Sequence, residues 1–190
     1  MILPIYLYGQ GVLRQETAEV PEDYPEFKPL LDNMYETLVK AEGVGLAAPQ
    51  VGLALRLFVV DLRPMADEEP KYKDYTKTFV NPEIVEYSEE KDTMEEGCLS
   101  IPGIHENVSR STKVRIHYLD ENFVAHEEVF EGFEARVIQH EYDHLEGKVY
   151  VDRLSSMRKM LLKNKLRNIS EGRVQVDYKM IFPNKRKGRG

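Results

Sequence analysis

The chain has 190 residues, of which 42% are hydrophobic and 31% charged, and its net charge is −7. This length and composition fit one globular domain, the acidic balance argues against DNA as a partner, and charges interrupt every apolar run before the ~20 residues that a membrane span requires. The single cysteine excludes an internal disulfide, and the short apolar start lacks the features of a secretory signal, so we expect a reducing, cytoplasmic location.

Hydrophobic periodicity predicts the secondary structure in chain order. A first helix is expected from about Phe27 to Leu38, with Gly43 as its C-terminal cap. Strands are expected over 55–62, 78–87, 113–119 and 123–130, the last two forming an antiparallel hairpin through a turn at 120–122. Further helices are expected over 134–145 and from about 155 toward Gly172, and the polar stretch 63–77 is predicted to be a surface insert.

This order of elements predicts the fold class. Strands are followed by helices without a regular βαβ alternation, which favours an α+β fold over a doubly wound sheet. We expect antiparallel or mixed sheets around a central helix, the one predicted over 134–145, with an additional C-terminal helix and a basic tail.

The predicted central helix carries the run QHEYDH over residues 139–144. One helical turn separates His140 from His144, so both imidazoles project from one face and can hold one metal ion. Glu141 lies beside that face, within reach of a water on the metal. The pattern predicts metal-dependent hydrolysis. The alternative is a surface helix that contains two histidines by chance and binds no metal.

A catalytic site of this kind needs a third protein ligand and an open position for water. No histidine follows His144, so the third ligand has to come from upstream. Cys98, in the run EGCLS over residues 96–100, is the one soft ligand available, and a thiolate with two imidazoles suits Zn²⁺ or Fe²⁺. A lone cysteine taken by itself is as often a small buried hydrophobe.

A third run, GVGLAAPQ over residues 43–50, superficially fits the dinucleotide-binding pattern G-x-G-x-x-A. That pattern must follow a strand and open a helix, whereas here a predicted helix precedes it and Pro49 follows at once. Small residues at this place permit close approach of another chain segment, and the Gln50 amide can donate to an oxyanion. By itself the run also fits a plain helix cap and turn.

Taken together, the three runs resemble, in order, the signature motifs of peptide deformylases. The resemblance extends from the second residue to about residue 155. It implies a catalytic domain over 1–167, with the insert at about 63–77, and a basic C-terminal extension over 168–190 for which the family suggests no role.

The resemblance implies a mechanism. Cys98, His140 and His144 would bind one Fe²⁺, for which Zn²⁺ or Ni²⁺ can substitute. Glu141 would act as general base in hydrolysis of the formyl group of N-formylmethionyl nascent peptides, releasing formate. Negative charge on the formyl oxygen would be met by the Gln50 amide and by the backbone N–H of Leu99.

The resemblance also implies where the substrate lies. An extended peptide would pair with the chain near Gly45 and Gly103. For the methionine side chain we expect an apolar pocket formed by Val44, Phe133 and Val137, and for Arg136 an aliphatic stem in the pocket wall with its head in solvent. Ordinary core packing is the alternative role for these last four residues. We also expect Asp143 to pair with Arg110 and so fasten the central helix to the Cys98 segment, whereas Glu96 has no assigned partner.

The charges divide unevenly along the chain. Residues 1–157 hold 15 basic and 31 acidic residues, a net of −16, whereas residues 158–190 hold 11 basic and 2 acidic residues, a net of +9. Because nascent chains are made on the ribosome, we expect a weak, salt-sensitive contact to ribosomal RNA. The residues that would make it are Arg158, Lys159, Lys163, Lys165 and the run 185–189; the alternative is a solvated tail that pairs with the acidic body.

Two other functions remain compatible with the motifs. A metallopeptidase that cleaves unmodified peptides would also need H-E-x-x-H. A non-catalytic protein with a structural Cys-His₂ metal site is disfavoured, because such a site usually has four protein ligands and gives Glu141 no purpose.

Overall fold

The structure is a computed structural model, and it describes residues 1–182. Over these residues it is a mixed α+β fold with three α-helices and antiparallel sheets, as the order of elements predicts. The helices are α1 (Phe27–Lys40), α2 (Gly132–Leu145) and α3 (Ser156–Ser170). The strands are β1 (Ile5–Tyr6), β2 (Gly45–Ala47), β3 (Leu57–Asp61), β4 (Thr76–Tyr87), β5 (Lys91–Cys98), β6 (Ile101–Ser111), β7 (Lys113–Leu119), β8 (Ala125–Glu131) and β9 (Met180–Ile181).

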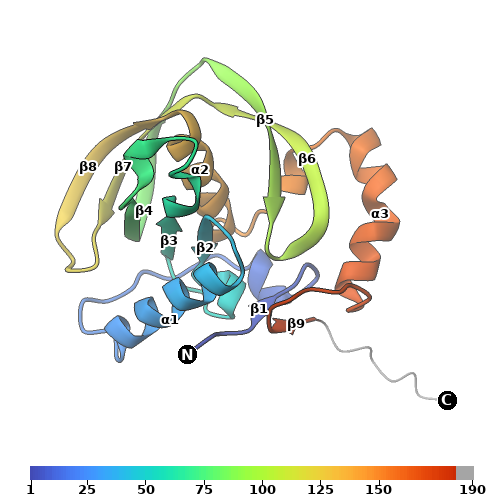
Figure 1. The fold of residues 1–190 in the computed structure, drawn as a ribbon, viewed down its shortest axis with the longest axis horizontal. Helices are drawn as coiled ribbons and strands as arrows, with labels where there is room; N and C mark the ends of the chain where they lie inside the picture. Colours follow the sequence, from blue (N-terminus) through green and yellow to red (C-terminus); the bar gives the residue numbers. More distant parts are fainter. Residues whose placement is uncertain (183–190) are drawn as a thin grey trace.

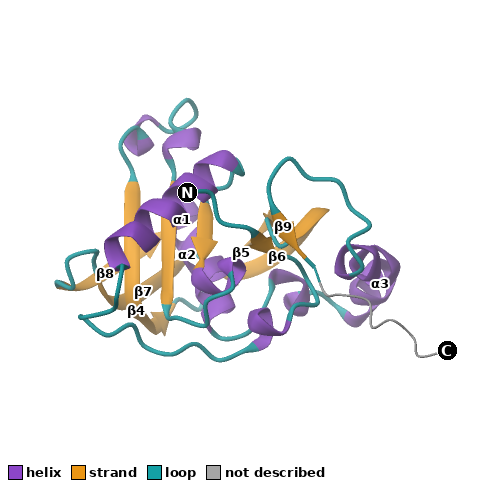
Figure 2. Cartoon of the chain, turned by 90° about the horizontal axis from the view of Figure 1, so that it is seen from below, coloured by secondary structure: helices purple, strands orange, loops and turns teal. Residues whose placement is uncertain are grey.

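The strands form three sheets. A five-stranded antiparallel sheet has the order β2-β3-β4-β7-β8, β5 and β6 form a long antiparallel hairpin, and β1 pairs in parallel with β9. In Figures 1 and 2 the five-stranded sheet and α3 lie at opposite ends of the molecule, with the β5–β6 hairpin between them. No helix of the described residues is long and apolar enough to cross a membrane.

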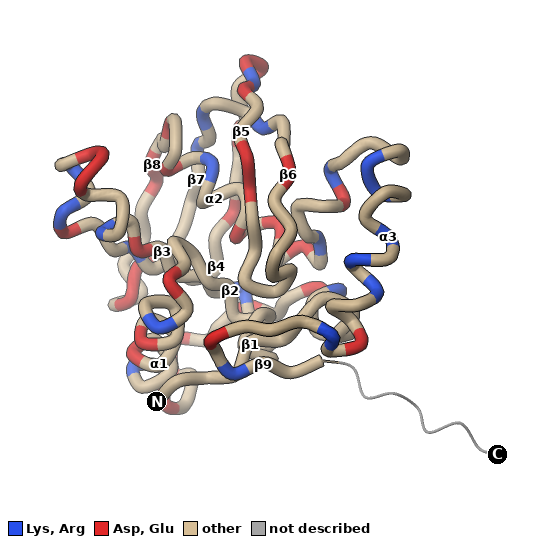
Figure 3. Tube along the Cα trace, turned by 45° about the vertical axis from the view of Figure 1, so that its right-hand side comes forward, with Lys and Arg blue, Asp and Glu red and all other residues tan. Residues whose placement is uncertain are grey.

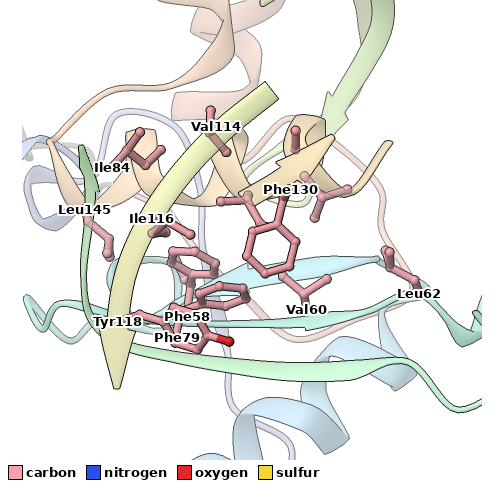
Figure 4. Packing of buried hydrophobic residues seen from close by; sticks show 14 of the residues in the cluster. Phe58, Val60, Leu62, Phe79, Ile84, Val114, Ile116, Tyr118, Phe130 and Leu145 are labelled. Atoms are coloured by element: carbon pink, nitrogen blue, oxygen red, sulfur yellow. The ribbon is translucent and has the colours of Figure 1, made fainter. Parts of the chain in front are cut away.

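Helix α2 is buried on nearly every side. Ten of its fourteen residues are buried, and it contacts both the five-stranded sheet and the β6 strand of the hairpin. Figure 4 shows the apolar side of this packing, where Phe58, Phe79 and Phe130 of the sheet form an aromatic cluster. A helix in this position can hold polar side chains away from bulk water, which is what the site requires.

Strand β3 explains why the sheet is covered on both faces. Phe58 and Val60 belong to the core cluster beneath α2, whereas Leu57 and Val59 belong to the cluster that α1 covers. Alternate residues of a strand point to opposite faces, so a strand buried on both faces needs an unbroken apolar run. The first four residues of β3, Leu-Phe-Val-Val over 57–60, supply that run.

Several sequence predictions need correction. The hairpin strands β5 and β6 were not predicted, because β5 is KDTMEEGC and offers no apolar alternation. Gly43 is not the left-handed cap of α1: Glu42 takes the positive φ of 56°, and the Gly43 N–H closes the turn on the Leu38 carbonyl. Phe123, predicted to begin a strand, lies in the preceding turn with a φ of 59°.

The predicted insert 63–77 is only partly a surface loop. It contains two short 3₁₀ turns, and its last two residues already belong to β4. Tyr72 is 2% exposed and packs in the core cluster under α2. The division expected after residue 167 falls inside α3.

Candidate metal centre and active site

Three side chains from two elements converge in one place. Cys98 ends β5, and His140 and His144 lie one turn apart on α2. Their ligand atoms all lie within 4.8 Å of one another, and Cys98 Sγ is 3.4 Å from His144 Nε2. Among the described residues this is the one group with the composition and spacing of a metal site.

The donor atoms fit a divalent metal ion. Bonds of about 2.0–2.3 Å at tetrahedral angles place such donors about 3.3–3.6 Å apart, which matches the sulfur–nitrogen distance. Burial and the neighbouring His140 lower the pKa of His144 to about 3, so its imidazole is neutral, the form that binds metal. His140 engages Glu96 Oε1 through Nδ1 at 2.8 Å, which leaves Nε2 for a metal.

Glu141 is held in an unusual environment. It is 4% exposed, and within the described residues its Oε2 atom has no hydrogen-bond partner. Burial raises its pKa to about 7. Gly45 of β2 lies directly against it: a Cβ added there would meet the Glu141 carboxylate, with its Cδ and Cγ atoms at 2.8 Å. An unpaired carboxylate of raised pKa beside a metal site is suited to accept a proton from water.

Gln50 is fixed by several hydrogen bonds and is 1% exposed. Its Oε1 accepts from the Ala47 N–H at 2.9 Å, and its Nε2 lies 3.2 Å from Ser100 Oγ and 3.5 Å from Cys98 Sγ. These contacts aim the amide nitrogen at the segment that carries Cys98. Leu99 follows Cys98 in the turn between β5 and β6 and also borders the cavity.

Glu96, which had no predicted partner, is the centre of a buried charge cluster. Its two oxygens accept from His140 Nδ1 at 2.8 Å, from Arg110 at 2.6 and 2.9 Å and from Arg136 Nη1 at 2.8 Å. Burial alone would raise the pKa of Glu96, but hydrogen bonds from His140 and Arg110 outweigh it and hold the pKa well below the usual range. The sequence signal for this role is its place two residues before the cysteine ligand.

Arg110 joins the hairpin to the helix. From β6 it donates to Glu96 on β5 and, through Nη1 at 2.9 Å, to Asp143 on α2. The predicted pairing of Arg110 with Asp143 is therefore present. Asp143 also accepts two hydrogen bonds of 2.7 Å from Arg153, a partner that the sequence did not suggest.

The expected orientation of Arg136 is wrong. Its side chain lines the cavity, but the residue is 4% exposed and its guanidinium is not in solvent. It donates to Glu96, to the Val108 carbonyl at 2.6 Å and to the Asp92 carboxylate. A buried guanidinium needs such partners. The β5–β6 hairpin brings Glu96 and Asp92 to Arg136, and because the sequence did not predict this hairpin, it did not predict these partners.

The site opens into a cavity of about 440 Å³. All the residues expected to bind substrate line it, and they come from the start of β2 and the residue before it, from the β5–β6 hairpin and from α2: Val44, Gly45, Gly103, Phe133, Arg136 and Val137. Gln50, Cys98, Leu99, His140 and Glu141 line it too, and His144 lies behind them with 1% exposure. The lining also includes residues that were not anticipated, among them Val176 and Tyr178 of the C-terminal segment.

A cysteine sulfur and two imidazoles beside an unpaired buried carboxylate form the donor arrangement of metal-dependent hydrolases. Together with the mixed α+β fold, this places the chain in that class. The open cavity beside the site has the size of a small-molecule or short-peptide pocket.

Comparison with known proteins narrows the class. The model of the polypeptide deformylase family matches residues 2–160, and this chain belongs to that family. A peptide deformylase of Christiangramia forsetii is 48% identical over 196 residues, covering 100% of both chains. The crystal structure of a Legionella pneumophila peptide deformylase has a TM-score of 0.78 at 37% identity, covering 88% of this chain and 95% of that one. An Acinetobacter baumannii peptide deformylase solved with Met-Ala-Ser bound has a TM-score of 0.74 at 38% identity, covering 81% and 99%.

Family membership settles the reaction. The protein is a hydrolase that removes the N-terminal formyl group from nascent peptides, and the family is metal-dependent. The two other functions that the motifs allowed, cleavage of unmodified peptides and a non-catalytic metal clip, are not those of this family.

Proposed function

We propose that Glu141, Gln50 and Leu99 carry out deformylation beside one Fe²⁺ held by Cys98, His140 and His144, with Zn²⁺ or Ni²⁺ as substitutes. The observation that carries the proposal is the unpartnered Oε2 of Glu141, buried beside three converging metal ligands. When bound, the cation would lower the pKa of water and polarise the formyl carbonyl. A thiolate with two imidazoles suits Fe²⁺ and Zn²⁺ alike.

The protein residues would move one proton and stabilise one charge. Glu141 takes a proton from the attacking water while the oxygen of that water bonds to the formyl carbon. The Gln50 Nε2–H and the Leu99 N–H donate to the formyl oxygen as it gains negative charge. Glu141 then gives the proton to the leaving nitrogen, the C–N bond breaks, and formate and a free N-terminal amine result.

The substrate would lie extended across the cavity. Gly45 and Gly103 both line the cavity, and no atom lies within 4 Å of a Cβ built at Gly103, whereas Glu141 lies against the Cβ position of Gly45. The apolar side chains of Val44, Phe133 and Val137 would receive the methionine side chain. The relative solved with Met-Ala-Ser supports a peptide of this kind.

The first experiment compares two peptides and two variants. Formyl-Met-Ala-Ser should release formate and Met-Ala-Ser should not be cleaved, and Glu141→Ala should lower formate release by about 10²–10⁴-fold because the general base is lost. The protein is purified without oxygen, since a thiolate beside Fe²⁺ oxidises readily, and metal content is measured in each variant. Glu131→Ala, which alters an exposed glutamate just before α2, is the control. Full formate release by Glu141→Ala would contradict the assigned role.

We further propose a cytoplasmic enzyme that meets the ribosome through α3. A ligand cysteine has to remain a reduced thiolate, which the cytoplasm ensures. Lys159, Lys163 and Lys165 are exposed on α3, whereas Arg158 pairs with Glu106 at 2.5 Å and is engaged within the protein. The run 185–189 lies outside the described residues. Figure 3 shows the blue Lys and Arg segments spaced along α3.

A further inference from the structure

The chain returns to the active site after its last helix. Gly172, with a φ of 72°, turns the chain behind α3, and the Phe182 ring packs against it. β9 then pairs in parallel with β1, and the N–H groups of Ile5 and Leu7 donate to the carbonyls of Lys179 and Ile181 at 2.8 and 2.7 Å. We refer to residues 173–182 as the return segment.

The return segment has an inner and an outer face. Val174, Val176, Tyr178 and Met180 are partly buried, whereas the residues between them are exposed. Val174 and Met180 pack against the apolar cluster beneath α3, and Val176 and Tyr178 line the catalytic cavity. The segment is therefore both anchored to the body of the protein and part of the cavity wall.

Tyr178 makes a direct contact with the catalytic turn. Its hydroxyl donates to the backbone carbonyl of Leu99 at 2.7 Å. Burial raises the pKa of Tyr178 to about 12, so the hydroxyl keeps the proton that it donates. The same turn is held on its other side by Ser100, whose carbonyl accepts from the Tyr8 N–H at 2.8 Å and whose Oγ lies 3.2 Å from Gln50 Nε2.

We propose that Tyr178 is a positioning residue of the deformylation reaction, which fixes the Leu99 backbone so that its N–H points at the formyl oxygen. The inference rests on the proposed role of the Leu99 N–H. Fixed donors stabilise developing charge because they need no reorganisation in the transition state, and a donor on a loosened turn loses that advantage. Tyr178 touches Leu99 rather than the reacting atoms, so its effect passes through the turn.

The test is Tyr178→Phe, which removes one oxygen atom and keeps the ring. Removing an oxyanion donor outright costs about 10²–10³ in rate, so loosening one should lower kcat by about 3- to 30-fold, with KM within about twofold. The affinity for Met-Ala-Ser, which has no formyl oxygen, should stay at the wild-type value. Tyr35→Phe is the matched control: its hydroxyl bonds Thr78 at 3.0 Å on a tyrosine that does not line the cavity, and its kcat should be unchanged.

Melting temperature and metal content separate positioning from folding. A lowered kcat with wild-type metal content and a melting temperature no lower than that of Tyr35→Phe supports the inference. A wild-type kcat overturns it, and so does a parallel loss of Met-Ala-Ser affinity, which would make Tyr178 part of the peptide pocket instead. Glu141→Ala is measured alongside. If that variant is inactive and Tyr178→Phe is not impaired, only the present inference fails; if Glu141→Ala is active, the proposed mechanism fails as well.

Discussion

At the scale of single residues, the site depends on how little room surrounds Glu141. The carboxylate is buried between α2 and Gly45 of β2, so its position is set by the absence of a side chain on the facing strand. Gly45 does not have a positive φ, so the backbone conformation does not require a glycine at this position. A glycine is required because the Cβ of any other residue would overlap the Glu141 carboxylate. The run GVGLAAPQ thus contributes space for Glu141, the proposed general base.

This close contact predicts the effect of Gly45→Ala. The new methyl group would overlap the Glu141 carboxylate and force it away from the metal ligands, so kcat should fall by about 10²-fold or more, as displaced catalytic groups commonly do. Metal content should remain that of the wild type, because none of the ligands moves. Gly11→Ala is the control, since no atom lies within 4 Å of its Cβ position. Equal kcat values in the two variants would show that Glu141 is not constrained by Gly45.

At the scale of elements, one arginine connects the hairpin to the central helix. Arg110 is 2% exposed and bonds Glu96 on β5 and Asp143 on α2, so the strand that ends in Cys98 is tied to the helix that carries both histidines. Glu96 in turn orients His140. The proposed metal ligands are therefore aligned by a charge cluster that spans β5, β6 and α2.

Arg110→Ala should lower the free energy of unfolding, because it disrupts this buried charge cluster. The substitution leaves Glu96 and Asp143 buried with fewer cationic partners, and breaking a buried ion pair in this way typically costs about 3–5 kcal/mol. Urea unfolding measures this loss, and metal titration should show weaker binding because the His140 ring is less well held. Arg115→Ala is the comparison. Its side chain is 45% exposed and pairs with the exposed Glu86 and Glu127, so about 1 kcal/mol or less is expected. A loss of similar size in both variants would refute the stabilising link that Arg110 makes between the hairpin and α2.

At the scale of the whole molecule, positive charge is concentrated in the C-terminal part of the sequence, from α3 onward. The acidic body would be repelled by RNA, so a ribosome contact through α3 has to rely on its exposed lysines. Changing Lys159, Lys163 and Lys165 together to Glu should reduce co-sedimentation with ribosomes several-fold and flatten its salt dependence, without loss of formate release. Changing Lys28, Lys40 and Lys91 to Glu alters the net charge equally at other places and should have little effect. Equal effects of the two triple variants would indicate non-specific attraction.

The three side chains predicted as metal ligands converge in the structure, whereas their surroundings were predicted poorly. His140, Glu141 and His144 lie within one and a half helical turns, so their relation follows from local geometry alone. Cys98 is distant in sequence but was identified through its motif. The predicted orientation of Arg136 was wrong because it depends on a hairpin whose strand β5 turns Asp92 and Glu96 inward, so that hydrophobic periodicity gives little strand signal there.

In the fold, too, elements with a local sequence pattern were predicted and elements that depend on distant contacts were not. The helices and the strands of the five-stranded sheet follow hydrophobic patterns and were predicted, apart from the short β2 and shifts of a few residues at element ends. The return segment was described from its charge alone, although Val174, Val176, Tyr178 and Met180 alternate with polar residues as a half-buried strand does. Its placement beside the catalytic cavity depends on pairing with β1, which no local pattern reveals.

The pairing of β1 with β9 has a consequence for how the enzyme itself is made. The two strands lie near opposite ends of the described chain, so their contact closes after nearly all the other residues have been synthesised. During its own translation the protein therefore completes the segments that carry Cys98, His140, Glu141 and His144 before the cavity wall that contains Tyr178. The part of the cavity wall that β9 anchors, including Tyr178, is therefore among the last parts of each copy to take its place.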